Sequence, residues 1–481
     1  MTAPVATAFT IYLAGMLAIG VYAYRLVESH PDYILGGRRL GPLVAALSAG
    51  AADMSGWLLL GLPGAVYAAG LNQIWIAVGL SLGAYLNWQF VAARLRRYTE
   101  AARNSLTLPD YLENRFRDTS RLLRGVSAVV ILFFFTVYTS AGLVSGAILF
   151  QQSFGLGYET ALWLGTAVIV SYTFLGGFLA VCWTDTAQGV MMFFALLIVP
   201  LVAAGDLGGW ENVIGNVRAI NPQFPDAFAA LSGPAAVSLF AWGLGYFGQP
   251  HILARFMAMR STRDVPVARF IGMAWMILSL YGAVFTGFVA IAAYAHSPLP
   301  NPETAFIRLS HDLFNPWISG WLLAAILAAI MSTVSAQILV SASALTQDFY
   351  RAFLRPQARD RELVWLGRIG VIAIALVAVW MAYNPESTVL GLVAYAWAGF
   401  GAGFGPVVIL SLVWPRMTRS GALAGMVAGA VTVVVWAQAK ASLWDIYEIL
   451  PGFVAALAAI VIVSLLDKQP AAEIRAEFAD V

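Results

Sequence analysis

The chain has 481 residues, of which 60% are hydrophobic and only 11% are charged, and its formal net charge is +2. This composition excludes an ordinary soluble domain and indicates a polytopic membrane protein in a lipid bilayer. Cys182 is the only cysteine, and the four histidines are far apart in sequence, which excludes an intrachain disulfide and disfavours a redox or zinc enzyme. The small net charge gives no indication of a nucleic-acid partner.

Thirteen apolar runs are long enough to cross a bilayer core of roughly 30 Å as helices, at about 1.5 Å per residue. No charged side chain precedes the first run, and Arg25 follows it. We therefore predict a retained span with the N-terminus outside, and not a cleaved signal peptide. The predicted spans are 6–24, 42–67, 74–93, 125–150, 161–178, 186–204, 235–253, 270–295, 318–346, 366–383, 389–414, 422–439 and 449–466.

The basic residues support this topology. An odd number of spans that starts outside places the C-terminus in the cytoplasm. The inner loops then contain all 27 lysines and arginines except Arg218, Arg308 and Lys440, as the positive-inside rule requires. We interpret the inner arginines as residues that set the orientation in a bacterial inner membrane. We treat residues 1–481 as one domain, with possible short surface helices in the outer segments 205–234 and 296–317 and a cytoplasmic tail over 467–481.

Asp53 lies near the middle of the second predicted span. A carboxylate at the centre of a membrane helix costs about 2.5–3.5 kcal/mol on insertion scales, so it normally faces a polar cavity or a cation. Nearby glycines weaken a regular helix, and Pro63 lacks a backbone donor, which releases carbonyl groups. We predict a cation site at Asp53. The alternative is that Asp53 caps a helix or forms a hydrogen bond inside the bundle.

A second interrupted span covers 235–253, where three glycines between Trp242 and Gly248 precede Pro250. In the predicted topology it crosses the membrane in the opposite direction to the span that contains Asp53, five spans later. Such a pair of broken segments is typical of inverted repeats with a transport site at the midplane. The glycines are equally compatible with close helix packing.

Few other polar groups lie deep in the apolar runs. Ser332 and Thr333 interrupt the ninth span, and their hydroxyls either supply oxygen ligands to a hard cation or bond back to their own helix. Tyr138 either faces lipid or lines a cavity. Asp185 is predicted at the start of the sixth span, where we interpret it as a helix N-cap, and a role in a second ion site stays open.

Several motifs resemble the sodium/solute symporter family over nearly the whole chain, and the branch that carries proline with sodium is the most similar. The resemblance implies a LeuT-type core of two inverted five-helix repeats, over 42–204 and 235–414. One extra helix over 6–24 precedes this core and two over 422–466 follow it. The motifs are DYILGGR at 32–38, ALSAG at 46–50 with the segment up to Gly64, LTLPDY at 106–111, the segment 243–256 with QPHILARF at its end, MST at 331–333 and FGP at 404–406.

The same resemblance implies the site residues. Sodium would bind the backbone carbonyls of Ala51, Met54 and Ala329 and the hydroxyls of Ser332 and Thr333, with Asp53 supplying the nearby charge. Ala52 departs from the family pattern, in which a serine is expected. Proline is a small zwitterion, so its carboxylate suits a broken-helix end and its ring suits aromatic faces. The implied substrate residues are Ser55, Gly56, Tyr138, Trp242, Tyr246 and Pro250.

The predicted function is therefore sodium-coupled import of L-proline by alternating access, without covalent chemistry. The first alternative keeps the fold and carries another small amino acid or a carboxylate, or uses protons in place of sodium. A membrane sensor that binds solute without moving it is a different class, and the short tail after Asp467 disfavours it. An integral-membrane enzyme is disfavoured because no nucleophile and base pair is evident.

Overall fold

The computed structural model describes residues 3–25, 30–173, 177–229, 231–383, 388–439 and 446–480. Within these ranges the regular elements are helices, and one isolated bridge joins Leu40 to Met259. The first half of the chain forms α1 (Ala3–Tyr24), α2 (His30–Leu35), η1 (Gly36–Arg38), α3 (Pro42–Asp53), η2 (Trp57–Gly61), α4 (Leu62–Ala69), η3 (Leu71–Gln73), α5 (Ile74–Leu86), η4 (Asn87–Val91), α6 (Ala92–Ala101), α7 (Leu108–Arg115), α8 (Leu122–Phe154), α9 (Tyr158–Thr173), α10 (Phe178–Asp206) and α11 (Trp210–Ile220).

The second half begins with three short helical pieces in sequence and ends with a short helix after the last long one. Its elements are α12 (Gly233–Phe240), η5 (Ala241–Gly248), α13 (Pro250–Met257), η6 (Thr262–Asp264), α14 (Val265–Ala293), η7 (Pro302–Thr304), α15 (Ala305–Leu313), α16 (Pro316–Ser343), η8 (Ala344–Leu354), α17 (Asp360–Ala382), α18 (Val389–Val413), α19 (Arg419–Ala439), α20 (Ile449–Leu466) and α21 (Ala472–Asp480).

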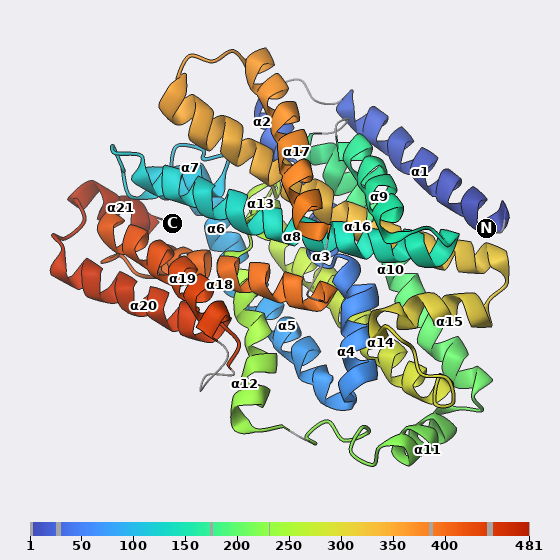
Figure 1. Ribbon diagram of the computed structural model, residues 1–481. Coiled ribbons are helices and arrows are strands. Elements are labelled where there is room, and N and C mark those ends of the chain that lie inside the picture. The colour runs from blue at the N-terminus through green and yellow to red at the C-terminus, as the bar shows by residue number, and fades with distance from the viewer. Residues whose placement is uncertain are drawn as a thin grey trace.

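The prediction of an all-α polytopic membrane protein is confirmed. In the described part of the chain, ten helices are long and apolar enough to cross a membrane, and the bent pair 42–53 and 57–69 makes an eleventh crossing if it is one span. The two remaining predicted spans fall on α9, a shorter apolar helix, and on the pieces α12, η5 and α13. In Figure 1, α8 crosses the middle of the bundle, α1 lies at one edge, and α19, α20 and α21 gather at the opposite edge.

The predicted interruption at Asp53 is present, but Pro63 does not cause it. Helix α3 ends at Asp53, Met54 leaves helical geometry with φ −89° and ψ 81°, and the two halves of the span bend by 62°. Pro63 lies in the first turn of α4, where a helix tolerates a missing donor. The chain therefore leaves its helical path at Met54 and Ser55, directly beside the carboxylate.

The second interruption is also present. Residues 241–248 form a 3₁₀ segment, Gln249 is extended, and α13 begins at Pro250. The glycines also permit the close packing that the alternative interpretation expected: a Cβ on Gly243 would lie 2.2 Å from the carbonyl oxygen of Gly79, and one on Gly248 2.1 Å from that of Phe400. The backbone of η5 thus lies directly against α5 and α18.

This packing predicts a large effect for Gly83→Ala. The new Cβ would lie 2.1 Å from the carbonyl oxygen of Gly243, and neither backbone can yield as a flexible side chain would. We expect a loss of about 1–3 kcal/mol of stability, the usual cost of overpacking. Thermal denaturation of the detergent-purified protein measures it. Gly15→Ala on α1 is the matched control, because a Cβ there meets nothing within 4 Å, and an equal effect of the two variants would contradict the prediction.

The N-cap interpretation of Asp185 is wrong. Helix α10 begins at Phe178, eight residues before the predicted start at Thr186, so Asp185 lies inside the helix with its side chain fully buried. The polar run resembled a helix start, but the hydroxyls of Thr184 and Thr186 bond back to the carbonyls of Ala180 and Cys182 in the preceding turn. The predicted fifth span, 161–178, corresponds to α9 as far as Thr173; residues 174–176 lie outside the described ranges, and Phe178 already belongs to α10.

Several of the arginines that the sequence places in inner loops make structural contacts. Arg255, placed in a loop by the sequence, is fully buried in α13. Arg96 donates from Nε to the carbonyl of Met259 at 2.6 Å, and Arg38 donates from Nη1 to the carbonyl of Met257 at 2.6 Å. Burial lowers the pKa of the Arg38 guanidinium to about 10, so it still carries its charge at neutral pH. Arg38 and Arg96 thus attach the end of α13 to η1 and α6.

The segments 205–234 and 296–317, which the sequence predicts to lie outside, contain the short helices that the sequence allowed. Helix α11 lies in the first, and η7 and α15 lie in the second. Glu303 of η7 is buried, and its carboxylate accepts hydrogen bonds from the backbone nitrogens of Val389 and Leu390 at 3.1 and 3.2 Å. A carboxylate at a helix N-terminus satisfies free donors and interacts favourably with the helix dipole. The segment 296–317 is therefore attached to the start of α18.

Candidate functional site

Asp53 is buried at the end of α3, with 1% of its surface exposed. Its Oδ2 accepts a hydrogen bond from the Tyr246 hydroxyl of η5, while Oδ1 has no hydrogen-bond partner within the described ranges. Its backbone carbonyl accepts from the Tyr138 hydroxyl at 3.0 Å and from Nε1 of Trp57 at 3.3 Å. A buried carboxylate with a free oxygen is costly unless a cation or proton compensates it.

Four oxygens meet where α3 crosses α16. The Ser332 hydroxyl donates to the carbonyl of Ala51 at 2.8 Å and lies 3.0 Å from that of Ala329, and the Thr333 hydroxyl lies 3.4 Å from the carbonyl of Ala51. All four residues are fully buried. The structure therefore brings together four of the five oxygen donors predicted for sodium, and Met54 lies at the adjacent break.

The chemistry of this donor set fits a hard cation of low charge. Carbonyl and hydroxyl oxygens are ligands for such ions, and the absence of nitrogen, sulfur and carboxylate ligands in the set disfavours a transition metal. No group of three or more His, Cys, Asp and Glu side chains that could hold a metal ion occurs in the part of the chain that the structure describes. The Asp53 side chain faces a cavity of about 20 Å³ with Tyr246, Asn87 and Met276, whereas Ser332 and Thr333 do not line it.

Aromatic rings surround the same break. The Trp242 ring lies 6.2 Å from that of Trp57 and stacks on Tyr447 at 5.4 Å, measured between ring centroids. The Tyr246 ring meets Trp397 edge-on at 5.1 Å. With Tyr138, which is buried and therefore does not face lipid, these rings provide apolar faces beside polar groups on Asp53.

The other predicted substrate residues differ in position. Ser55 is buried in the break, and Gly56 packs against α8, where a Cβ would lie 2.6 Å from the side chain of Ser145. Pro250 begins α13 and lines a separate small cavity of about 30 Å³ with Phe178 and Leu339. Tyr138, Tyr246, Trp242 and Ser55 do not line that cavity.

Sequence reasoning missed an ion-paired triad beside the site. Arg255 Nη2 lies 3.0 Å from Asp185 Oδ2, its Nε donates to the Ser48 hydroxyl at 3.0 Å, and that hydroxyl donates to Asp185 at 2.8 Å. All three side chains are fully buried, and the guanidinium also lies over the Phe178 ring. The triad joins α3, α10 and α13. The signal was the position of Arg255 only five residues after Pro250, on the same short helix.

Trp397 of α18 was also missed. Its indole nitrogen donates to the carbonyl of Trp242 at 2.7 Å, and a Cβ on Gly245 would overlap the indole. Trp397 therefore fixes the path of η5 and the position of Tyr246. Its place in the glycine-rich run before Phe404 was the available signal, because a large side chain among small residues often fills a helix crossing.

Residues 33–429 match the model of the sodium:solute symporter family. The chain belongs to this family. It is 54% identical over 486 residues to the sodium/proline symporter of Salmonella typhimurium, covering 100% of the chain and 96% of that protein. It is 54% identical over 467 residues to the high-affinity proline transporter of Bacillus subtilis, covering 97% and 98%.

Solved structures with the same fold include a substrate-bound, outward-open sodium-coupled sialic acid symporter. It is 18% identical, with a TM-score of 0.82 over 98% of this chain and 99% of that one. MhsT in complex with L-phenylalanine is 14% identical, with a TM-score of 0.55 over 88% and 98%. At these identities the likeness shows the fold alone. The family assignment makes this chain a multi-pass membrane transporter and not an enzyme.

Proposed function

We propose that this protein is a secondary transporter that imports L-proline together with sodium across a bacterial inner membrane by alternating access. The observation that carries the proposal is the convergence, at the break after Asp53, of an oxygen donor set, a buried carboxylate and aromatic rings. Full-length relatives at 54% identity are named sodium/proline symporter and high-affinity proline transporter, which supports proline as the cargo.

The proposed topology has thirteen spans in one domain, with the N-terminus outside and the C-terminal tail in the cytoplasm. Two inverted repeats cover 42–204 and 235–414, one helix over 6–24 precedes them, two over 422–466 follow them, and 467–481 form the tail. Support comes from the distribution of the 27 basic residues and from the two broken segments, each of which falls in the first span of a proposed repeat.

In the proposed sodium site the ion binds the carbonyls of Ala51, Met54 and Ala329 and the hydroxyls of Ser332 and Thr333, with the charge of Asp53 nearby. An ion held between α3 and α16 would fix the end of α3. This end carries the Asp53 carbonyl and carboxylate, which bond to the two tyrosine hydroxyls of the aromatic pocket. Sodium and proline should then each tighten the binding of the other, because coupling free energy is reciprocal.

The proposed solute pocket consists of Ser55, Gly56, Tyr138, Trp242, Tyr246 and Pro250. Its aromatic rings suit the pyrrolidine ring of proline, and the broken end of the helix suits the carboxylate. A guanidinium is not needed for the carboxylate, and the nearest buried one on α13, that of Arg255, is already paired with Asp185.

Removing the hydroxyls of α16 tests the sodium site. Ser332→Ala and Thr333→Ala should each raise the sodium concentration for half-maximal proline binding by about threefold to tenfold, the effect of losing one ligand worth about 1 kcal/mol. Proline binding to purified protein across a sodium titration measures this. Ser335→Ala is the control on the same helix, because its hydroxyl bonds only to the carbonyl of Ser332. An unchanged sodium titration in both variants would show that the ion binds elsewhere.

Uptake of labelled proline into proteoliposomes tests the function itself. An inward sodium gradient should drive accumulation, while an equal potassium gradient should not. Competition by other small amino acids and by carboxylates tests the cargo, and an imposed proton gradient tests the coupling ion. Binding without accumulation would favour a solute sensor and would contradict transport.

A further inference from the structure

A cavity of about 280 Å³, the inner cavity, lies at the end of the bundle that the proposed topology places inside, and Asp53 does not line it. Its walls come from the residues before α7, from α7, from the start of α8 and from η8. Both signs of charge line it. The lining residues are Leu106, Thr107, Asp110, Arg121, Arg124, Gln347, Asp348, Arg351, Ala352 and Pro356.

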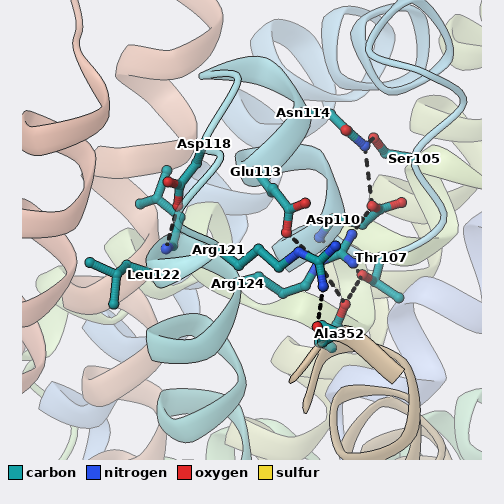
Figure 2. Close-up of polar contacts among 12 residues, drawn as sticks. Ser105, Thr107, Asp110, Glu113, Asn114, Asp118, Arg121, Leu122, Arg124 and Ala352 are labelled. Atoms are coloured by element: carbon teal, nitrogen blue, oxygen red, sulfur yellow. Dashed lines mark hydrogen bonds and ion pairs between the residues drawn. The ribbon is translucent and has the colours of Figure 1, made fainter. Parts of the chain in front are cut away.

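Arg124 is the centre of the charges on one wall. Its guanidinium pairs with Asp110, with Glu113 at 2.9 Å and with Asp348 at 3.6 Å. Arg121 reaches across to η8 and donates to the carbonyl of Ala352. Figure 2 shows both guanidiniums directed to the same region between α7 and η8. Arg124 is therefore held by three carboxylates and keeps partners if one of them is neutralised.

Asp348 is a buried acid of this wall with an incomplete set of hydrogen-bond partners. Its side chain is 1% exposed, its Oδ1 accepts from the Thr107 hydroxyl at 3.0 Å, and its Oδ2 has no hydrogen-bond partner in the described ranges. A buried carboxylate oxygen without a partner is unfavourable, so a cationic ligand that reaches it gains more than it would at an exposed acid.

Asp348 and Thr107 also separate two spaces. Together with Leu106 they line both the inner cavity and the small apolar cavity that extends to Pro250 and Phe178. Pro250 begins α13, directly after the broken segment that carries Tyr246. The hydrogen bond between Thr107 and Asp348 therefore lies between the polar inner cavity and the space next to the broken helix.

We propose that the inner cavity is a release site for the zwitterionic solute, which it binds after the contact between Thr107 and Asp348 opens. Asp348 takes the positively charged nitrogen of the solute, and Arg121 and Arg351 face its carboxylate. This proposal rests on the proposed function, since it concerns the exit of the same solute. The proposal assigns Asp348 to the path of the substrate. A cavity lined by charges of one sign would not retain a zwitterion, whereas this cavity is lined by charges of both signs.

Transport measured from each side of the membrane tests the release site. We expect Asp348→Asn to raise the half-saturating proline concentration at the inner face by about tenfold or more, the effect of losing a charged hydrogen-bond partner. The half-saturating proline concentration at the outer face should be unchanged. Right-side-out and inside-out vesicles give the two values. Arg351→Gln should also raise the half-saturating concentration at the inner face. Because Arg351 is half-exposed, we expect this substitution to leave folding intact.

Asp118→Asn is the matched control. Asp118 is another buried carboxylate at the start of α8, paired with Arg419, but it does not line the cavity. It should leave both values unchanged. Unchanged inner values in Asp348→Asn and Arg351→Gln would overturn the release site while leaving the proposed function intact, and so would equal changes at both faces. Lack of sodium-driven proline uptake by the unmodified protein would instead overturn both proposals.

Discussion

Replacing Asp53 by asparagine is expected to reduce sodium-driven proline uptake by about a hundredfold. Asparagine keeps the size of the side chain and an oxygen that can accept from the Tyr246 hydroxyl, so the change removes mainly the charge. At an effective dielectric constant of about 20, a unit charge about 6 Å from a cation contributes roughly 3 kcal/mol, or about a factor of one hundred in binding. The sodium dependence of initial uptake rates in proteoliposomes measures the loss.

A stability control separates this effect from misfolding. Thermal denaturation of Asp53→Asn without sodium should show a protein at least as stable as the unmodified one, because the variant no longer buries a carboxylate whose Oδ1 lacks a partner. Added sodium should stabilise the unmodified protein and not the variant, since a ligand stabilises only the state that binds it. Uptake that persists unchanged in the variant would show that this carboxylate does not serve the ion.

Breaking the buried pair between Arg255 and Asp185 is the second large effect that we expect. Arg255→Met leaves a fully buried carboxylate with only the Ser48 hydroxyl for support, and Asp185→Asn leaves a buried guanidinium without a counter-charge. Each single change should cost about 3–5 kcal/mol. The variant carrying both changes should recover most of this loss, because neither buried charge remains.

The unmodified protein, the two single variants and the double variant together form a double-mutant cycle. Denaturation midpoints in detergent give the coupling between the two side chains, and sodium-driven uptake by the double variant gives a second, independent result. Additive losses would mean that the pair does not act as a unit. A stable double variant that fails to transport would show that the charges serve the movement of α13 against α3 and α10, beyond holding these helices together.

Local composition predicted the positions of most helices well, since a run of apolar residues has few alternatives in a bilayer. The boundaries were less accurate where polar residues occur inside a span. Thr184, Asp185 and Thr186 resemble a helix start, yet their polar groups are satisfied by the preceding turn and by an arginine 70 residues away. Arg255 was misread for the same reason, because its partner is distant in sequence.

Residue patterns alone identified a multi-pass membrane protein, interruptions in the apolar segments 42–67 and 235–253, and the place of Asp53 at one of them. These features follow from local hydropathy and from the backbone preferences of glycine and proline, which need no knowledge of neighbours. The groups that come into contact could be identified only from the folded chain. Ser332 approaches Ala51 across 281 positions of sequence, Asp348 meets Thr107 across 241, and Arg255 is buried against Asp185. Such contacts depend on helix packing over the whole bundle, where each buried polar group must find a partner that no local pattern specifies.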